Sequence, residues 1–102
     1  MDMSEIMRQA QQMQARMGQV EKELAARTVT AAVGGGMVTV TFNGKNELLS
    51  IAIDKEVINP EDRTMLQDLI VSAVNEGIRK AQEMAQTEMR KVTGNINIPG
   101  IF

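Results

Sequence analysis

The sequence lacks cysteine, histidine, tyrosine and tryptophan, and only two of its 102 residues are phenylalanine. Without cysteine there is no disulfide framework and no thiolate metal site, which fits a reducing cytoplasm. Without histidine and cysteine the common nucleophilic triads and imidazole general bases are excluded. Zinc would need carboxylate ligands alone, which is rare, and the calcium-loop pattern is missing. We therefore expect a protein that is not an enzyme, with no catalytic residues, no metal and no cofactor.

Two local patterns resemble sites of chemistry but do not meet the requirements. The run Gly34-Gly35-Gly36 lacks the Gly-Lys-Ser/Thr ending of a phosphate-binding loop and lies between two strand-like segments. It is better interpreted as a hairpin connection. The acidic pair Glu61 and Asp62 is accounted for by a predicted helix start, where acids meet the positive end of the helix dipole. Neither pattern indicates a small-molecule substrate.

The sequence also has no long apolar run. The N-terminal residues have no apolar core of a secretory signal, and the longest uncharged stretch, 28–44, contains four threonines, four glycines and an asparagine. Such a stretch does not cross a membrane. We expect a cytoplasmic protein that is not bound to membranes.

A chain of this length forms one small domain, residues 1–102, with a thin core. At this size folding buries only roughly 60–65% of the surface that the unfolded chain exposes. Hydrophobic residues make up 43% of the chain and charged residues 24%, which is ordinary for a globular protein and argues against disorder. Because aromatic residues are so few, aliphatic residues and nine methionines must form the core. A homodimer is one remedy for a core this thin.

The first segment has the heptad spacing of an amphipathic helix, predicted over about residues 3–27. Apolar residues alternate at intervals of three and four. The stripe consists of Met3, Ile6, Ala10, Met13, Met17, Val20 and Leu24. It is narrow, so we expect it to lie in a groove or to pair with another helix, where its residues would be shielded from water.

Strand-like segments follow, at about residues 28–33, 37–43 and 46–54. Their β-branched residues alternate with period two, and Asn43-Gly44 is a strong signal for a tight hairpin turn. The predicted sheet is therefore an antiparallel meander. Apolar residues of the last two strands are expected on one face: Val38, Val40 and Phe42, with Leu49, Ile51 and Ile53 on the matching positions. Because the first two strands carry no charge, we expect one face under a helix and the other partly under a partner.

A second long helix is predicted over about residues 60–92. Asn59 is its expected cap and Pro60 its first residue, and Gly94 is the expected stop before a tail at 93–102. The chain is thus of the α+β class, in the order α-β-β-β-α, with a three-stranded antiparallel meander flanked by two long helices.

The net charge is −2, which is less basic than usual for a nucleic-acid-binding protein. The charge is unevenly distributed, however. Segments 6–20 and 77–102 are mildly basic, whereas 59–76 is acidic. These segments fit either ordinary solvated helix faces or patches for the DNA backbone, doubled in a dimer. The lack of aromatics argues against single-stranded nucleic acid, which stacks on exposed rings.

The order of these segments resembles the YbaB/EbfC family of bacterial nucleoid-associated proteins, and the match covers essentially the whole chain. The most specific pieces are VTFNGKNELLSIAID (40–54), DLIVSAVNEGIRKA (68–81) and GNINIPGIF (94–102). The resemblance implies a tweezer-like homodimer that binds duplex DNA with little sequence specificity, alters its conformation, and contributes to nucleoid organisation and gene regulation.

The resemblance further implies that DNA contacts come from the terminal helices. Carried over to this chain, the implied contact residues are Arg8, Gln12, Arg16, Arg79, Lys80, Arg90 and Lys91. An alternative from another class is a protein-interaction adaptor whose first helix docks on a partner protein. Strongly salt-dependent affinity for any duplex favours the first hypothesis, and a co-purifying protein without DNA favours the second.

Overall fold

The computed structural model describes residues 2–93 and contains two helices and three strands. In chain order the elements are α1 (Met3–Ala26), β1 (Thr28–Val33), β2 (Val38–Asn43), β3 (Leu48–Ile53), the 3-10 turn η1 (Lys55–Val57) and α2 (Arg63–Thr93). This confirms the α+β class and the α-β-β-β-α order. The predicted stop at Gly94 and the tail beyond it lie outside the described residues.

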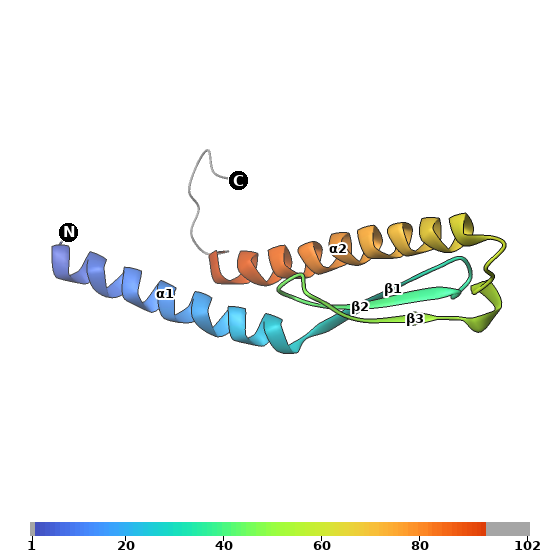
Figure 1. The fold of residues 1–102 in the computed structure, drawn as a ribbon. Helices are drawn as coiled ribbons and strands as arrows, with labels where there is room; N and C mark the ends of the chain where they lie inside the picture. The colour runs from blue at the N-terminus through green and yellow to red at the C-terminus, as the bar shows by residue number, and fades with distance from the viewer. Residues whose placement is uncertain (1, 94–102) are drawn as a thin grey trace, which may run out of the picture.

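The sheet has the strand order β1-β2-β3 with antiparallel pairing throughout, and α2 lies along one of its faces, against β1 and β2 (Figure 1). The core lies between this helix and the sheet. Its buried members are Ala31, Val38, Val40, Phe42, Ala73 and Ala81. Removing a Val or Phe side chain from water contributes roughly 1.5–3 kcal/mol to folding, so a few such residues determine the stability of this small core.

Helix α2 approaches the sheet most closely at Gly77. A Cβ atom built on Gly77 would overlap the ring of Phe42 and lie 2.9 Å from Cγ2 of Val40. The missing side chain therefore allows the helix backbone to rest directly on the aromatic ring. Glycine is costly inside a helix, but here it is required by the packing.

The connection between β2 and β3 is longer than the two-residue turn predicted at Asn43-Gly44. Asn43 ends β2, and its buried Oδ1 accepts hydrogen bonds from two backbone N–H groups of the turn, each at 3.0 Å. The positive φ occurs at Asn46, not at Gly44. Gly44 instead donates its N–H to the carbonyl of Leu24 at 2.8 Å, and a Cβ there would lie 2.7 Å from that oxygen. The turn thus binds the C-terminal end of α1.

Strand β3 contains a bulge that the sequence pattern does not reveal. Thr41 pairs with Ser50 but the next residue, Phe42, pairs with Leu48, so Leu49 has no partner in the ladder. The prediction that Leu49 shares a face with Phe42 is wrong, and Leu48 takes that position. A single extra residue reverses the alternation of faces, which is why a strict period of two fails here.

Helix α2 begins three residues later than predicted. Asn59 caps a turn rather than the helix, because its Oδ1 accepts the N–H of Glu61 at 3.0 Å, and Pro60 lies within that turn. Asp62 caps the helix, with its Oδ1 accepting the N–H of Met65 at 3.3 Å. An acidic residue still meets the positive end of the dipole, but it is Asp62 that does so.

Helix α1 extends away from the body of the molecule (Figure 1). Residues 2–12 are all exposed, and burial increases only toward the C-terminal end, where Leu24 is 3% exposed. In the single chain the heptad stripe is not shielded from water, since Met3 is 72% exposed and Met17 is 37% exposed, and its pairing with another helix stays a prediction. Within the described residues, the neighbours of α1 include α2, β2 and the β2–β3 turn.

Candidate nucleic-acid interface

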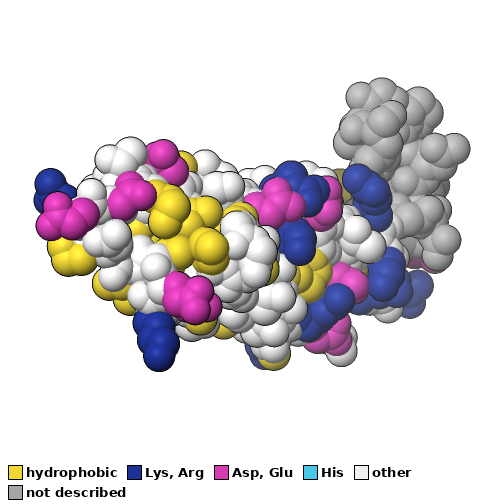
Figure 2. All heavy atoms as spheres, turned by 90° about the vertical axis from the view of Figure 1, so that its right-hand side faces the viewer, with side chains coloured by type: hydrophobic (Ala, Val, Ile, Leu, Met, Phe, Trp, Pro, Cys, Tyr) yellow, Lys and Arg dark blue, Asp and Glu magenta, His cyan; other side chains and the backbone are white. Residues whose placement is uncertain are grey.

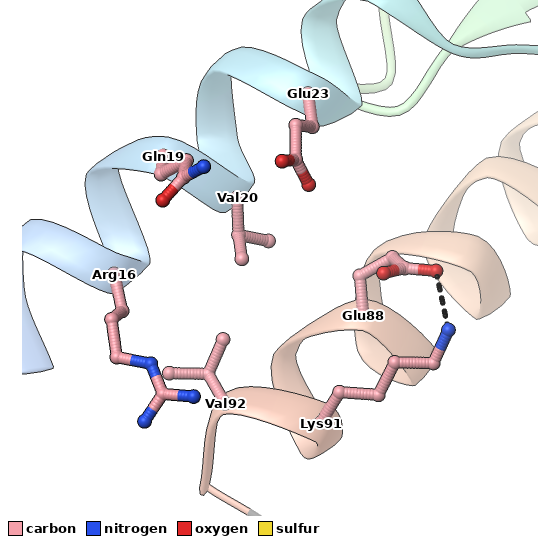
Figure 3. A pocket seen from close by; sticks show the side chains of 7 residues that line it. All are labelled: Arg16, Gln19, Val20, Glu23, Glu88, Lys91 and Val92. Atoms are coloured by element: carbon pink, nitrogen blue, oxygen red, sulfur yellow. Dashed lines mark hydrogen bonds and ion pairs between the residues drawn. The ribbon is translucent and has the colours of Figure 1, made fainter.

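The second half of α1 and the last turns of α2 face each other across a cleft of about 230 Å³ (Figure 3). Seven residues from the two helices line it: Arg16, Gln19, Val20, Glu23, Glu88, Lys91 and Val92. Arg16 and Lys91 were both predicted as DNA contacts and are 75 positions apart in the sequence. The fold places both in the lining of this cleft. The cleft thus holds two of the predicted contact residues, one from each helix.

Glu88 is the centre of the ion pairs in this region. Its Oε1 lies 2.5 Å from Nη1 of Arg27 and 3.2 Å from Nζ of Lys91. The hydrogen bond from Arg27, and then that from Lys91, lowers the pKa of Glu88 below its ordinary value of 4.5. Because the folded-state pKa is depressed, the stabilisation is present at neutral pH and is lost as pH falls through that pKa. The pair therefore joins the end of α1 to α2 at physiological pH.

Lys80 lines a second cleft, of about 370 Å³, between β1 and α2. Its Nζ donates a hydrogen bond to the carbonyl of Thr30 at 3.1 Å, which holds the side chain along the sheet. Arg27 also lines this cleft, and Glu88 lines both clefts. Arg27 of this cleft and Lys91 of the first cleft thus share Glu88 as a partner.

Arg79 is neutralised within α2. Its guanidinium lies 2.5 Å from carboxylate oxygens of both Glu76 and Glu83. These carboxylates raise the pKa of Arg79, and the hydrogen bond from Arg79 lowers the pKa of Glu76. Arg79 lines neither cleft, so the fold does not bring it together with Arg16 and Lys91.

The remaining predicted contacts are exposed on the helices. Arg8 and Gln12 precede Arg16 at intervals of four, so the three side chains share one face of α1. Arg8 pairs with Glu5, at 3.5 Å and in solvent, where an ion pair contributes little. Arg90 is exposed near the end of α2 and forms no ion pair within residues 2–93.

Comparison with known proteins identifies the family. The model described as the YbaB/EbfC DNA-binding family matches residues 1–96. The chain belongs to this family. The match confirms the family resemblance inferred from the order of the segments.

Relatives and a solved structure support the same assignment. A "Nucleoid-associated protein" of Syntrophobacter fumaroxidans is 54% identical over 95 residues, covering 93% of this chain and 86% of the relative. A protein of the same name from Pelotomaculum thermopropionicum is 50% identical, covering 99% and 96%. The crystal structure of the uncharacterized protein HP0035 from Helicobacter pylori superposes with a TM-score of 0.83 at 31% identity, covering 92% of this chain and 99% of that one. The YbaB/EbfC fold is therefore shown for this chain.

Sequence reasoning missed two residues of this candidate interface, Arg27 and Glu88. They are 61 positions apart, and neither stands out in its own segment. Only the fold reveals that Arg27 and Lys91 share Glu88 as their ion-pair partner.

The described structure was also searched for metal-binding side-chain groups and for membrane-spanning helices. Within residues 2–93 no group of three or more Asp, Glu, His or Cys side chains is placed to hold a metal ion. In the same part of the chain, no helix combines the length and apolar character needed to span a bilayer.

Proposed function

We propose that this protein is a nucleoid-associated protein of the bacterial cytoplasm that binds the backbone of duplex DNA with little sequence specificity. It alters DNA conformation and so contributes to nucleoid organisation and gene regulation. It acts by binding, without catalysis, cofactor or small-molecule substrate. One observation carries the proposal: in a chain of a DNA-binding family, Arg16 and Lys91 line one cleft between α1 and the end of α2.

The contact surface that we propose combines the predicted residues with one that the fold adds. Arg16 and Lys91 form its centre, with Arg27 and Lys80 beside them. Arg8, Gln12 and Arg90 extend it along the exposed ends of the helices. Arg79 is the weakest member, because a phosphate must compete with two carboxylates for it.

The buried aromatic ring supports a duplex rather than a single strand as ligand. Phe42 is 2% exposed and lies under α2, so it offers no face for a base to stack on. The other phenylalanine, Phe102, lies outside the described residues. Backbone contacts need only cationic and polar side chains, and α1 and α2 supply these.

The net charge of −2 does not prevent this binding, because the acidic segment lies at the opposite end of α2. The helix begins beside Asp62, and Glu88 lies 26 residues later, which at 1.5 Å per residue is roughly 40 Å. Exposed charges are largely screened beyond about 8–10 Å at physiological salt. The acidic start of α2 therefore has little effect at the cleft, where Glu23 and Glu88 are the anions beside Arg16 and Lys91.

A gel-shift titration at several salt concentrations tests the function. We expect binding to unrelated duplexes with similar affinity, with log Kd rising with log salt by about 0.9 for each phosphate contacted. Affinity that differs greatly between duplexes would contradict backbone binding. Failure to bind any duplex at low salt, with a protein that co-purifies from cells, would favour the adaptor alternative instead.

We further propose that the chain is a homodimer whose two subunits together form the tweezer-like shape. The edge strand β3 supports this, because Leu48, Leu49 and Ile51 are 41–54% exposed. An exposed apolar edge strand is a liability unless a partner covers it. Figure 2 shows more hydrophobic side chains gathered at the end of the body where α2 begins. A dimer would also double each basic surface.

Sedimentation at micromolar concentration should give twice the 11.2 kDa mass of the chain. Leu49→Asp should shift the protein to the monomer, because it places a charge where the partner excludes water. Val71→Asp is the matched control, since Val71 is similarly exposed (59%, against 54% for Leu49) but lies on α2. A parent protein that sediments as a monomer, or a Leu49→Asp variant that remains dimeric, would contradict the interface.

A further inference from the structure

Glu88 differs from the other carboxylates near the clefts in its depth. Its side chain is only 16% exposed, whereas Arg27 and Lys91, which it pairs, are 50% and 69% exposed. The two cations therefore present themselves to solvent while the carboxylate lies beneath them. Figure 3 shows Glu88 on α2 inside the cleft, joined to Lys91. A phosphate that approaches from solvent meets the cations first.

The charge balance of the region depends on this carboxylate. The residues that line the two clefts include four cations (Arg16, Arg27, Lys80 and Lys91) and three anions (Glu23, Glu83 and Glu88), which leaves a net charge of +1. Neutralising Glu88 alone would raise the balance to +2 and would free both of its partners. Glu23 lines the same cleft, but no ion pair holds it within the described residues.

We propose that Glu88 is an internal counter-ion that limits the affinity for DNA by neutralising Arg27 and Lys91 at the interface between α1 and α2. This inference rests on the proposed backbone binding of duplex DNA. Glu88 positions the two cations and offsets part of their charge, so that DNA is held loosely enough to be released at physiological salt. It does not itself contact the phosphates.

The experiment compares Glu88→Gln with the parent protein in gel-shift titrations on one duplex over a range of salt. Glutamine keeps the shape and an oxygen acceptor but removes the charge. We expect affinity at low salt to rise about three- to tenfold, and the salt slope to steepen by up to about 0.9 for each phosphate newly contacted. A merely structural role for Glu88 would instead leave the slope unchanged and lower the melting temperature.

Two further variants isolate the cause. Glu83→Gln removes the same formal charge from α2, but Glu83 is 63% exposed and its partner Arg79 stays paired with Glu76. It should change affinity less than Glu88→Gln. Adding Arg27→Gln to Glu88→Gln should abolish much of the gain, because the freed guanidinium is then absent.

The possible results distinguish a failure of the proposed role of Glu88 from a failure of the proposed DNA binding. If the parent binds duplexes and Glu88→Gln binds no more tightly than Glu83→Gln, the role of Glu88 is refuted and the DNA-binding proposal stands. If the gain persists in full in the Arg27→Gln background, release of Arg27 is not its cause, and the proposal is refuted in this form. If the parent binds no duplex at low salt, both proposals fall.

Discussion

Replacing Gly77 by alanine is expected to lower the free energy of unfolding by about 2–4 kcal/mol. The new methyl group would overlap the ring of Phe42 and press on Cγ2 of Val40, both of which belong to the buried core. Alanine favours a helix over glycine by roughly 1 kcal/mol, but this gain is smaller than the cost of moving α2 off the sheet. Chemical denaturation followed by circular dichroism measures the change.

Gly18→Ala is the matched control for this experiment, because it makes the same substitution inside a helix. A Cβ atom at Gly18 would meet nothing within 4 Å. The helix preference then acts alone, and the stability of α1 should rise by about 0.5–1 kcal/mol. If both variants were destabilised equally, the close approach of α2 to Phe42 would not be the cause.

Removing Arg16 and Arg90 together should weaken duplex binding by about tenfold or more at low salt and make the salt slope shallower. Neither side chain is held by an ion pair within residues 2–93, and each change acts twice in the proposed dimer. The melting temperature should barely change, because isolated surface charges contribute little to stability. Gel-shift titrations at several salt concentrations, paired with thermal melts, give both quantities.

The matched control removes two cations at the other end of the body, Lys55 in η1 and Arg63 at the start of α2 (Figure 1). The double variant Lys55→Ala with Arg63→Ala loses the same formal charge. It should retain most of the affinity if the interface lies where α1 and α2 meet. Equal losses in the two double variants would indicate a diffuse electrostatic effect. Loss of binding to one sequence only would show that Arg16 or Arg90 reads bases.

Local sequence patterns were sufficient to predict the type of each helix and strand but not the strand bulge or the helix cap. The heptad stripe and the alternating strands fix the type of each element, because helix and strand periodicities are properties of neighbouring residues. The bulge at Leu49 and the shifted cap at Asp62 depend on which of several local hydrogen bonds forms, and the sequence offers equally good donors and acceptors nearby.

The candidate interface was predictable only in part. Arg16 and Lys91 stand out in basic segments, so composition and the family resemblance lead to them. Whether a cation is available depends on its partners: Arg79 is neutralised by residues three and four positions away, whereas Arg27 meets Glu88 across 61 positions. The first case can be suspected from helical spacing, but the second requires the fold.

The hydrogen bond from Gly44 to Leu24 fixes α1 at its C-terminal end, so a rotation there moves the N-terminal end furthest. The helix is held at its C-terminal end by this contact and by Arg27, while residues 2–12 extend freely into solvent. With 24 residues at 1.5 Å each, the arm is about 36 Å long, so a rotation of about 10° at the held end moves the tip by roughly 6 Å. A shift of that size is close to the spacing between neighbouring phosphates. If α1 contacts DNA as proposed, small adjustments at the β2–β3 turn would suffice to fit the helix to DNA of different local shape.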